Sequence, residues 1–464
     1  MSKLYVFGIG GTGSRVLKAL TMLLASGVKC GTDTIVPIII DPDASAADLT
    51  RSVESIKRYI SIRSKLGFSG DVKNRFFLTE IEETVPNFKL KLDNTQDVKF
   101  KDYMSVSTMS QSNKALINML FSQKNLEADM KVGFKGNPNI GSIVLNQFEE
   151  SEEFANFANN FTANDKIFII SSIFGGTGAS GFPLLAKMLR SNKNIPNHNI
   201  INNAQMGAIT VLPYFSVKPD GDSEIDSGTF ISKAKAALAY YLNNISRNNT
   251  LDQLYYIADT QREAYDNHEG GREQKNKAHL IELLSALAII DFSNSTHKGN
   301  TIHKEYGLAQ GSNDVIFGDL GGETRDYLQV PLTQFMLFSN YFKHQTQGAY
   351  LDQSWAKNSK IDKSFVTSGY AKNVFNFQQE FCSWLEEMAN NTRKFAPYEL
   401  SNISRAFDIV KGEKTKKIVS LSSNYALYDS FLNSYKKVAV SPEQQFVELF
   451  YDATKRLVDK KYNF

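Results

Sequence analysis

Residues 174–181 have the sequence Phe-Gly-Gly-Thr-Gly-Ala-Ser-Gly and lie between an apolar run and a helical pattern. The run before them, residues 166–172, predicts a buried strand, and residues 182–190 predict a helix with Pro183 in its first turn. Glycines let the backbone approach a ligand, and the first N–H groups of a helix are free donors aligned with its dipole. This stretch therefore predicts a phosphate-like anion site, with a tight turn that needs glycine only for its geometry as the alternative.

A second unit of strand, glycine turn and helix begins the chain. Residues 4–9 predict a buried strand, residues 8–14 are Gly-Ile-Gly-Gly-Thr-Gly-Ser, and residues 15–24 carry apolar side chains at helical spacing. A Gly-x-Gly-x-x-Gly pattern fits dinucleotide binding, adenylation and other phosphate chemistry alike. Gly10, Gly11, Thr12 and Gly13 are therefore candidate ligand-contacting residues.

Two acids follow the next predicted strand, residues 34–40. Asp41 and Asp43 would stand at the carboxyl edge of a sheet, where they could meet a ribose hydroxyl or a metal ion on the phosphates. Their alternative role is to cap the helix that residues 46–62 predict.

A third glycine-bearing turn is Gly-Phe-Lys-Gly-Asn-Pro-Asn-Ile-Gly at residues 133–141, which makes Gly136 and Asn137 candidates. Its alternative is a plain surface loop. Residues 67–130 have mixed patterning and predict an insertion at the sheet edge, with a strand near 75–79 and a helix near 112–126.

Strands continue to alternate with helices up to residue 292. Residues 206–212 and 254–258 predict strands, the first followed by Pro213, and residues 276–292 predict a long apolar helix. This alternation predicts an α/β fold with a parallel sheet and helices on both faces. Residues 293–313 predict a loop, and the chain beyond 330 is mostly helical in pattern.

Composition excludes several classes of protein. The chain has 464 residues with a net charge of +3, which predicts neither a nucleic-acid nor a membrane partner. Two cysteines, Cys30 and Cys382, cannot build a disulfide framework or a multi-cysteine zinc site. No segment reaches the roughly 20 apolar residues of a membrane span, and a strand begins within three residues of the start, so we expect a cytoplasmic protein.

The glycine turns are expected to form one site, because ligands bind beyond the carboxyl ends of the strands in an open parallel sheet. A nucleoside triphosphate could use all three turns, whereas one diphosphate rarely needs them. Lysine and arginine are scarce there, only Lys135 and Arg15, and a P-loop lysine motif is absent. Backbone N–H groups must therefore hold most of the ligand's charge.

The order and the sequences of these segments resemble those of the tubulin/FtsZ superfamily over residues 3–292. Gly175–Gly181 is similar to its Gly-Gly-Gly-Thr-Gly-Thr/Ser-Gly signature loop, with Phe174 at the position of the first glycine. Five further segments resemble family motifs in the same order: Gly8–Ser14 the first phosphate loop, Asp41–Asp43 the Asn-Thr-Asp turn, Gly136–Gly141 the Ala-Asn-Pro-Glu-Val-Gly segment, Thr210–Phe215 the ribose-side turn, and Leu251–Ile257 the Val-Asp-Ser-Leu strand.

The resemblance implies a Rossmann-like nucleotide-binding domain at 1–275, a central helix at 276–292 and a mainly helical C-terminal domain at 293–464. It implies binding of GTP or GDP with Mg²⁺, ATP not being excluded, and self-association, with filaments as the family's assembly. Divergent bacterial tubulin-like proteins are the nearest pattern. Its implied nucleotide contacts are Gly10, Gly11, Thr12, Gly13, Asp41, Asp43, Gly136, Asn137, Gly175, Gly176, Thr177, Gly178, Ala179, Ser180, Pro213 and Asn276.

Two departures from the family pattern concern the base and the reaction. Where the family places a guanine-reading asparagine, this chain has Asp259 or Thr260, with Asn276 as a substitute. The acids that complete the family's GTPase site have no clean counterpart; Asp314 and Asp319 are the candidates, with an ordinary turn as their alternative. Nucleotide binding is therefore better supported than hydrolysis, and hydrolysis better than filament formation.

Three other functions fit part of the sequence. A non-catalytic scaffold protein could keep a nucleotide as a structural ligand. An adenylating enzyme of the ubiquitin-activating type fits the N-terminal turn but commonly carries zinc-binding cysteine pairs and leaves residues 175–181 unexplained. A nicotinamide-dependent oxidoreductase is favoured by the first glycine turn alone.

Overall fold

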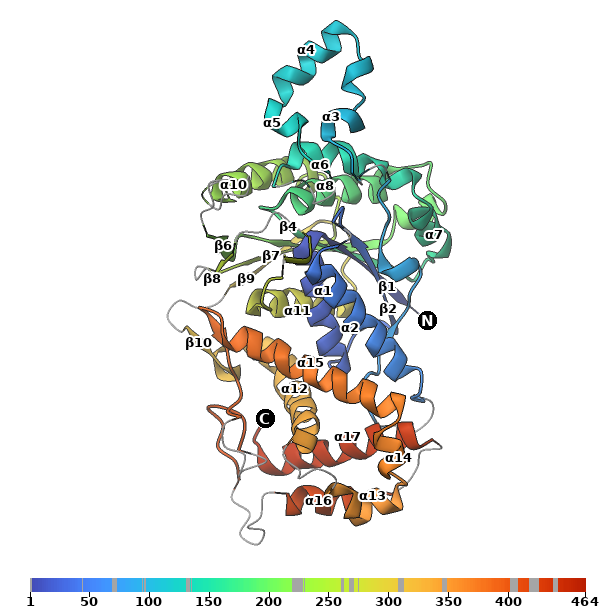
Figure 1. The fold of residues 1–464 in the computed structure, drawn as a ribbon, viewed down its shortest axis with the longest axis vertical. Helices are drawn as coiled ribbons and strands as arrows, with labels where there is room; N and C mark the ends of the chain where they lie inside the picture. The colour runs from blue at the N-terminus through green and yellow to red at the C-terminus, as the bar shows by residue number, and fades with distance from the viewer. Residues whose placement is uncertain are drawn as a thin grey trace.

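The computed structural model is an elongated molecule built around one sheet (Figure 1). It describes residues 2–43, 45–68, 73–93, 95, 97–130, 134, 136–218, 228, 230–259, 263–266, 271–273, 275–307, 313–343, 349–400, 408–416, 425–436 and 441–464. Three residues singled out from the sequence, Gly133, Lys135 and Thr260, lie outside these ranges.

The sheet has seven parallel strands in the order β3-β2-β1-β4-β5-β7-β9, which confirms the predicted α/β fold class. The strands are β1 (Lys3–Ile9), β2 (Thr34–Ile40), β3 (Glu80–Ile81), β4 (Lys166–Ser172), β5 (Gln205–Val211), β7 (Gln253–Ala258) and β9 (Ile302–Gly307). Residues 4–9 and 34–40 are fully buried, as apolar strands covered on both faces must be. The chain leaves β1 toward β2 and β3, and later leaves β4 toward β5 and β7, so the topological switch point lies between β1 and β4.

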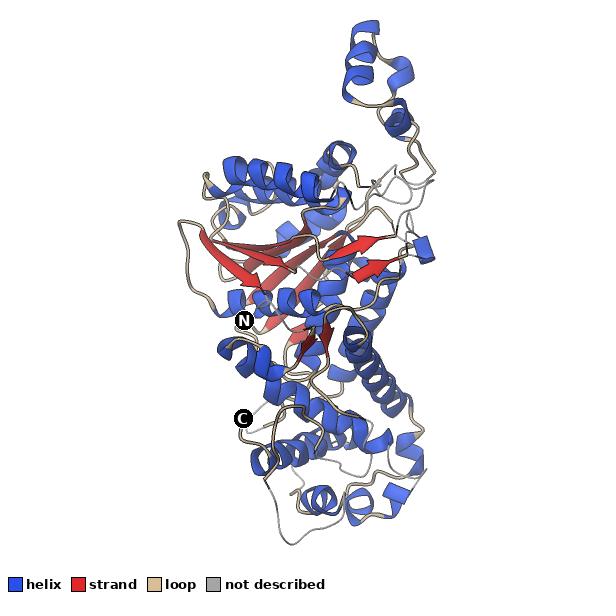
Figure 2. Ribbon diagram, turned by 90° about the vertical axis from the view of Figure 1, so that its left-hand side faces the viewer, coloured by secondary structure: helices blue, strands red, loops and turns tan. Residues whose placement is uncertain are grey.

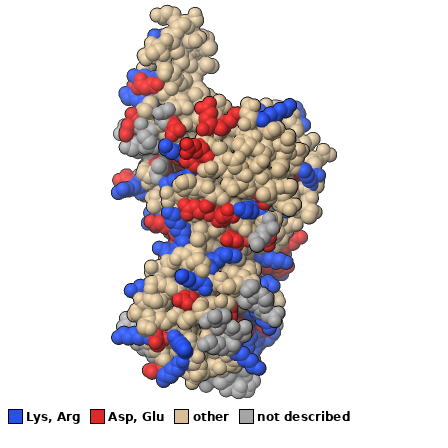
Figure 3. Space-filling model, turned by 90° about the vertical axis from the view of Figure 1, so that its right-hand side faces the viewer, with Lys and Arg blue, Asp and Glu red and all other residues tan. Residues whose placement is uncertain are grey.

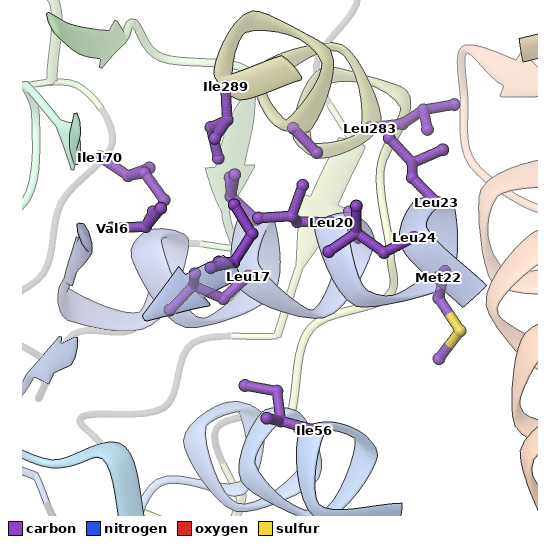
Figure 4. Close-up of a cluster of buried hydrophobic side chains, with 14 of the residues drawn as sticks. Val6, Leu17, Leu20, Met22, Leu23, Leu24, Ile56, Ile170, Leu283 and Ile289 are labelled. Carbon is purple, nitrogen blue, oxygen red and sulfur yellow. The ribbon is translucent and has the colours of Figure 1, made fainter. Parts of the chain in front are cut away.

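Helices cover both faces of the sheet, as Figures 1 and 2 show. One face carries α6 (Pro138–Val144), α7 (Glu152–Asn160), α8 (Gly176–Ser191) and α10 (Phe230–Tyr241), and the other carries α1 (Gly10–Ala25), α2 (Ala47–Arg63) and α11 (Leu280–Asn294). Helix α1 is buried on nearly all sides, because it packs against the sheet, α2 and α11 at once. Leu17 and Leu20 of α1 lie among Val6, Ile170 and Ile289 in this core (Figure 4).

The C-terminal part is mostly helical, as predicted. Its main helices are α12 (Gly322–Lys343), α13 (Ser354–Asn358), α14 (Lys363–Val366), α15 (Gly369–Ala389), α16 (Ala426–Asn433) and α17 (Pro442–Lys461), with one small sheet of β10 (Asp314–Val315) and β11 (Lys394–Phe395). Helix α15 packs on α2, and α12 packs on α15 and α17, which forms a third layer below the sheet. None of the helices within the described ranges is long and apolar enough to cross a membrane.

Four expected elements are corrected by the structure. Helix α8 begins at Gly176, so Pro183 lies inside this helix and not in its first turn. The central helix begins at Leu280 instead of Asn276, because His279 and Glu282 form a capping box that fixes its start. Residues 75–79 form a turn, and the edge strand is β3 at Glu80–Ile81. Strand β9 at Ile302–Gly307 lies in the segment expected to be a loop, and it extends the sheet by pairing with β7.

Part of the predicted insertion, helix α3 (Phe100–Tyr103) and the helices that follow it, protrudes from the top of the molecule (Figures 1 and 2), whereas Phe76 and Phe77 pack against the C-terminal helices. The predicted helix of the insertion divides in two, α4 (Gln111–Leu120) and α5 (Gln123–Leu126), since Ser122 caps a new helix start. None of the residues of α4 is buried, and the face in Figure 3 shows few charged side chains on this tip.

The turn between β1 and α1 leaves no room for side chains. A Cβ on Gly13 would lie 2.4 Å from the carbonyl carbon of Gly8, well inside van der Waals contact. We expect Gly13→Ala to lower the free energy of unfolding by at least about 1–3 kcal/mol, measured by urea denaturation. Gly11→Ala is the matched control, since its Cβ would lie 3.4 Å from Arg15 Nη1, and equal stability of the two variants would contradict this account of the turn.

Candidate functional site: converging glycine turns

The three glycine turns come together beyond the carboxyl ends of β1 and β4. A Cβ on Gly10 would lie 3.6 Å from Thr177 Cβ and 3.9 Å from the backbone nitrogen of Gly178, so the first and second turns lie side by side. A Cβ on Gly176 would lie 3.0 Å from the backbone nitrogen of Asn137, so the third turn lies against the second. The turns thus surround one place at the topological switch point.

Within these turns, the buried residues support the structure, whereas the partly exposed residues are accessible to a ligand. Ser180 is buried, and its hydroxyl donates to the carbonyl of Gly176 at 2.7 Å, which makes it part of the helix. Thr12, Gly13, Gly176, Gly178 and Ala179 are buried too, whereas the partly exposed members are Gly11, Gly136, Asn137, Gly175 and Thr177. These partly exposed residues are the ones that a ligand could touch directly.

The third turn is fixed by its own polar contacts. The side-chain oxygen of Asn137 accepts from the backbone nitrogens of Asn139 (3.1 Å) and Ile140 (3.4 Å), which caps α6. Lys233 of α10 donates from Nζ to the carbonyl of Gly136 at 2.9 Å. Lys233 therefore brings a positive charge to the turn, which sequence reasoning missed because this lysine lies about a hundred residues away.

Phe174, which stands where the family signature has a glycine, belongs to an aromatic cluster. Its ring lies 6.2 Å from Tyr214, 5.3 Å from Phe215 and 5.0 Å from Phe230, between ring centroids. The residues after β5, among them the buried Pro213, are thereby packed against the start of the second glycine turn.

Arg15, just beyond the first turn, is the centre of a buried network. Its Nε donates to Glu282 Oε1 at 2.5 Å, and its Nη1 donates to Asp48 Oδ2 at 2.6 Å. Its Nη2 donates to Tyr214 OH at 2.9 Å and to Thr12 Oγ1 at 3.2 Å. All five side chains are buried, so this arginine joins the first turn to α2, α11 and the segment after β5, and its charge is balanced within the protein.

The network continues to the C-terminal part. Arg51 donates to Asp48 Oδ1 at 2.8 Å and to Glu387 Oε1 of α15 at 3.1 Å. The second oxygen of Glu387 accepts from the backbone nitrogen of Ala278 at 2.7 Å, just before α11. Sequence reasoning missed this network, although Glu282, a carboxylate in the first turn of a strongly apolar helix, is the signal that could have indicated it.

We expect Arg15→Met to lower the free energy of unfolding by about 3–5 kcal/mol, because it leaves the buried carboxylate of Glu282 without its cation. Guanidinium denaturation measures the change. The double variant Arg15→Met/Glu282→Leu should regain part of the loss, since removing both partners costs less than removing one.

Arg58→Met is the control, because its pair with Glu380 is partly exposed and should be worth less than about 1 kcal/mol. A loss from Arg15→Met no larger than that of Arg58→Met would show that the buried network does not hold the turn.

Asp41 and Asp43 lie at the same edge of the sheet, at the end of β2. Asp43 accepts from the backbone nitrogen of Gly271 at 2.6 Å and from Ser45, so its carboxylate closes a turn; the cap position of α2 is Ala46, and the expected capping role is wrong. Burial, and to a lesser degree the charge of Asp43, raises the pKa of Asp41 to about 7. A carboxyl with so high a pKa is typical of a functional site.

The raised pKa of Asp41 gives a pH-dependent stability. Between its unfolded value near 4 and its folded value of about 7, the folded state holds the extra proton, so stability falls as pH rises through this window. Asp41→Asn keeps the neutral form at every pH. Its melting temperature should gain on the wild type progressively from pH 5 to pH 8, measured by thermal unfolding; a constant difference would contradict the assignment.

Of the candidates for reading the base, Asp259 has its side chain bonded within the protein, whereas Asn276 is held through its backbone. The Oδ1 of Asp259 accepts from Arg393 Nε at 2.8 Å, in an ion pair whose two side chains are almost fully buried. Asn276 precedes α11, and its carbonyl accepts from Arg51 at 2.6 Å. Asp259 is therefore not supported as the residue that reads the base, because its carboxylate is paired with Arg393 of the C-terminal part.

The two candidate catalytic acids lie in the C-terminal part. Asp314 is in β10, strongly exposed, with its carboxylate 3.6 Å from Lys394 Nζ. Asp319 accepts from the backbone nitrogen of Ile316 at 2.9 Å and so closes its own turn, as the alternative for this residue predicted. Nowhere in the described ranges do three or more His, Cys, Asp or Glu side chains gather as a metal site.

Comparison with known proteins gives structural matches only. No protein-family model matches the sequence, and no curated protein does. Among solved structures, the chain matches a GTPγS-bound protofilament of CetZ2 from Haloferax volcanii (15% identity, TM-score 0.26, 55% of this chain and 48% of that one) and a GDP-bound monomer of CetZ1 from the same organism (14%, 0.28, 55% and 50%). It also matches an empty FtsZ dimer from M. jannaschii (18%, 0.26, 55% and 45%).

The chain is similar to these solved structures at 14–18% sequence identity. It spans about half the length of these tubulin/FtsZ-type chains, and the TM-scores are low. A function must therefore be argued from the contacts among the three glycine turns of this chain.

Proposed function

We propose that this chain is a nucleotide-binding protein of the tubulin/FtsZ type, which holds a nucleoside triphosphate or diphosphate at the glycine turns. The observation that supports this most is the meeting of Gly10 with Thr177 and of Gly176 with Asn137. Two full helices, α1 and α8, begin at this place, and their dipoles attract an anion. The polyphosphate would lie against the partly exposed residues Gly11 and Thr177.

Backbone N–H groups would form most of the hydrogen bonds to the phosphate oxygens, because Arg15 is already bonded to protein groups. Lys233 adds one cation beside the third turn. If Mg²⁺ accompanies the nucleotide, most of its ligands would be phosphate oxygens and water, as is usual for this ion. Asp41, with its raised pKa, is the carboxyl at this edge that a cation would help to ionise.

The family resemblance favours guanine as the base. We therefore propose GTP and GDP as the ligands, with ATP as the alternative nucleotide to be tested. We also propose self-association, which the family resemblance implies; the matched structures include a protofilament and a dimer. Hydrolysis by Asp314 and Asp319 would require these acids to act on a neighbouring copy. A static scaffold that keeps its nucleotide is the second candidate, favoured by the turn-closing contact of Asp319.

The test is to denature the purified protein, identify the released nucleotide by chromatography, and measure GTP and ATP binding to the emptied protein. Gly11→Ala should bind nucleotide at least about tenfold more weakly, a loss of about 1.4 kcal/mol, because its new methyl group covers the turn where the phosphate would lie. Its folding should be intact, because the added Cβ makes only an ordinary contact.

Gly318→Ala is the matched control, since a Cβ there meets nothing within 4 Å, and it should bind as the wild type does. Binding of neither GTP nor ATP by the wild type would refute the proposed function. Pelleting and phosphate release at rising protein concentration then separate an assembling GTPase from a static scaffold.

A further inference from the structure

A cavity lies away from the glycine turns, where the sheet domain meets the C-terminal helices. Its volume is about 430 Å³, within the usual range for small-molecule sites. Four parts of the chain line it: the end of α1 at Ser26 and Gly27, the turn at residues 73–78, helix α12 and helix α17.

The turn at residues 73–78 is held in place by two adjacent buried rings. Phe76 lies 5.0 Å from Tyr451 of α17 and 5.1 Å from Phe335 of α12, between ring centroids. Phe77 has a positive φ of 58°, a conformation that costs energy for a bulky residue and persists only where packing enforces it. The side chain of Asn74 closes the turn through both of its polar atoms, to the backbone nitrogen and carbonyl of Phe76.

This rigid turn presents two cations to the cavity. Lys73 and Arg75 are exposed, and neither forms an ion pair with any residue that the structure describes. Lys455 of α17 stands on the lining as well, 2.6 Å from Asp459, the one carboxylate among the lining residues. The lining is thus net positive, and two of its charges have no counter-ion in the described protein.

The remaining lining is largely apolar. It includes the side chains of Leu78, Val330, Pro331 and Tyr451. Pro331 lies inside α12 and has no N–H to donate, so this wall offers packing surface instead of hydrogen-bond donors. A small ion such as free phosphate would pair with the cations but would not pack against this apolar wall.

We propose that this cavity binds a small organic anion, whose carboxylate, phosphate or sulfonate group lies between Lys73, Arg75 and Lys455. Its apolar body packs against Pro331 and Tyr451. Because the cavity is walled by both the sheet domain and helices α12 and α17, a bound anion ties these two parts together and raises the stability of their contact. This site is independent of the nucleotide site.

The probe for the test is 8-anilinonaphthalene-1-sulfonate, an aromatic anion of this class, titrated into the full chain by fluorescence. Lys73→Gln/Arg75→Gln should weaken binding at least tenfold and abolish the rise in melting temperature that the probe gives the wild type. Val330→Trp, which fills the cavity without changing its charge, should weaken binding to the same extent.

Lys193→Gln/Lys298→Gln is the control with the same change in charge, placed at exposed positions outside the cavity, and should bind as the wild type does. Circular dichroism checks that each variant is folded; if the first double variant is not, Lys455→Gln at its exposed position replaces it and should weaken binding. The proposal would be overturned if the probe bound the wild type, the cavity-filling variant and the charge variants with equal affinity. It would also be overturned if inorganic phosphate displaced the probe equally well from all of these proteins.

Discussion

The contact between backbone segments at the glycine turns is the constraint on which the rest of this structure depends. Gly176 lies against Asn137 at a distance that leaves little space for a side chain, and Gly10 lies in ordinary contact distance of Thr177. The starts of α1 and α8 are thereby brought together, with their partial positive charges at one place. Like charges so placed repel, and a polyanion relieves the repulsion, which is the physical reason to connect this geometry with a nucleotide.

Arg15 resolves a different electrostatic problem. It lies beneath the first turn and forms ion pairs with two buried carboxylates, Asp48 and Glu282, whose burial without a cation would be costly. Since its donors are used in this way, it supports the turn without being available to a ligand. The same network, through Arg51 and Glu387, anchors the C-terminal helices to the start of α11.

The C-terminal part is thus connected to the sheet domain by both charge and packing. The Arg393–Asp259 ion pair joins it to the end of β7. The rings of Phe76 and Phe77, which precede β3, pack against its helices α12, α15 and α17. A base-reading role for Asp259 is displaced by this connection. The cavity beside residues 73–78 lies at the same boundary.

The sequence by itself determined the parallel α/β fold, the mostly helical C-terminal part and the three turns, because apolar runs followed by glycines are local signals. It did not reveal β9, whose residues His303, Lys304 and Glu305 are polar and are recruited by pairing with β7 at the sheet edge. Nor did it show that the partners of Arg15 are Asp48 and Glu282, up to 267 residues away. Which side chains meet in a buried ion pair depends on how helices pack, and only the tertiary structure decides that.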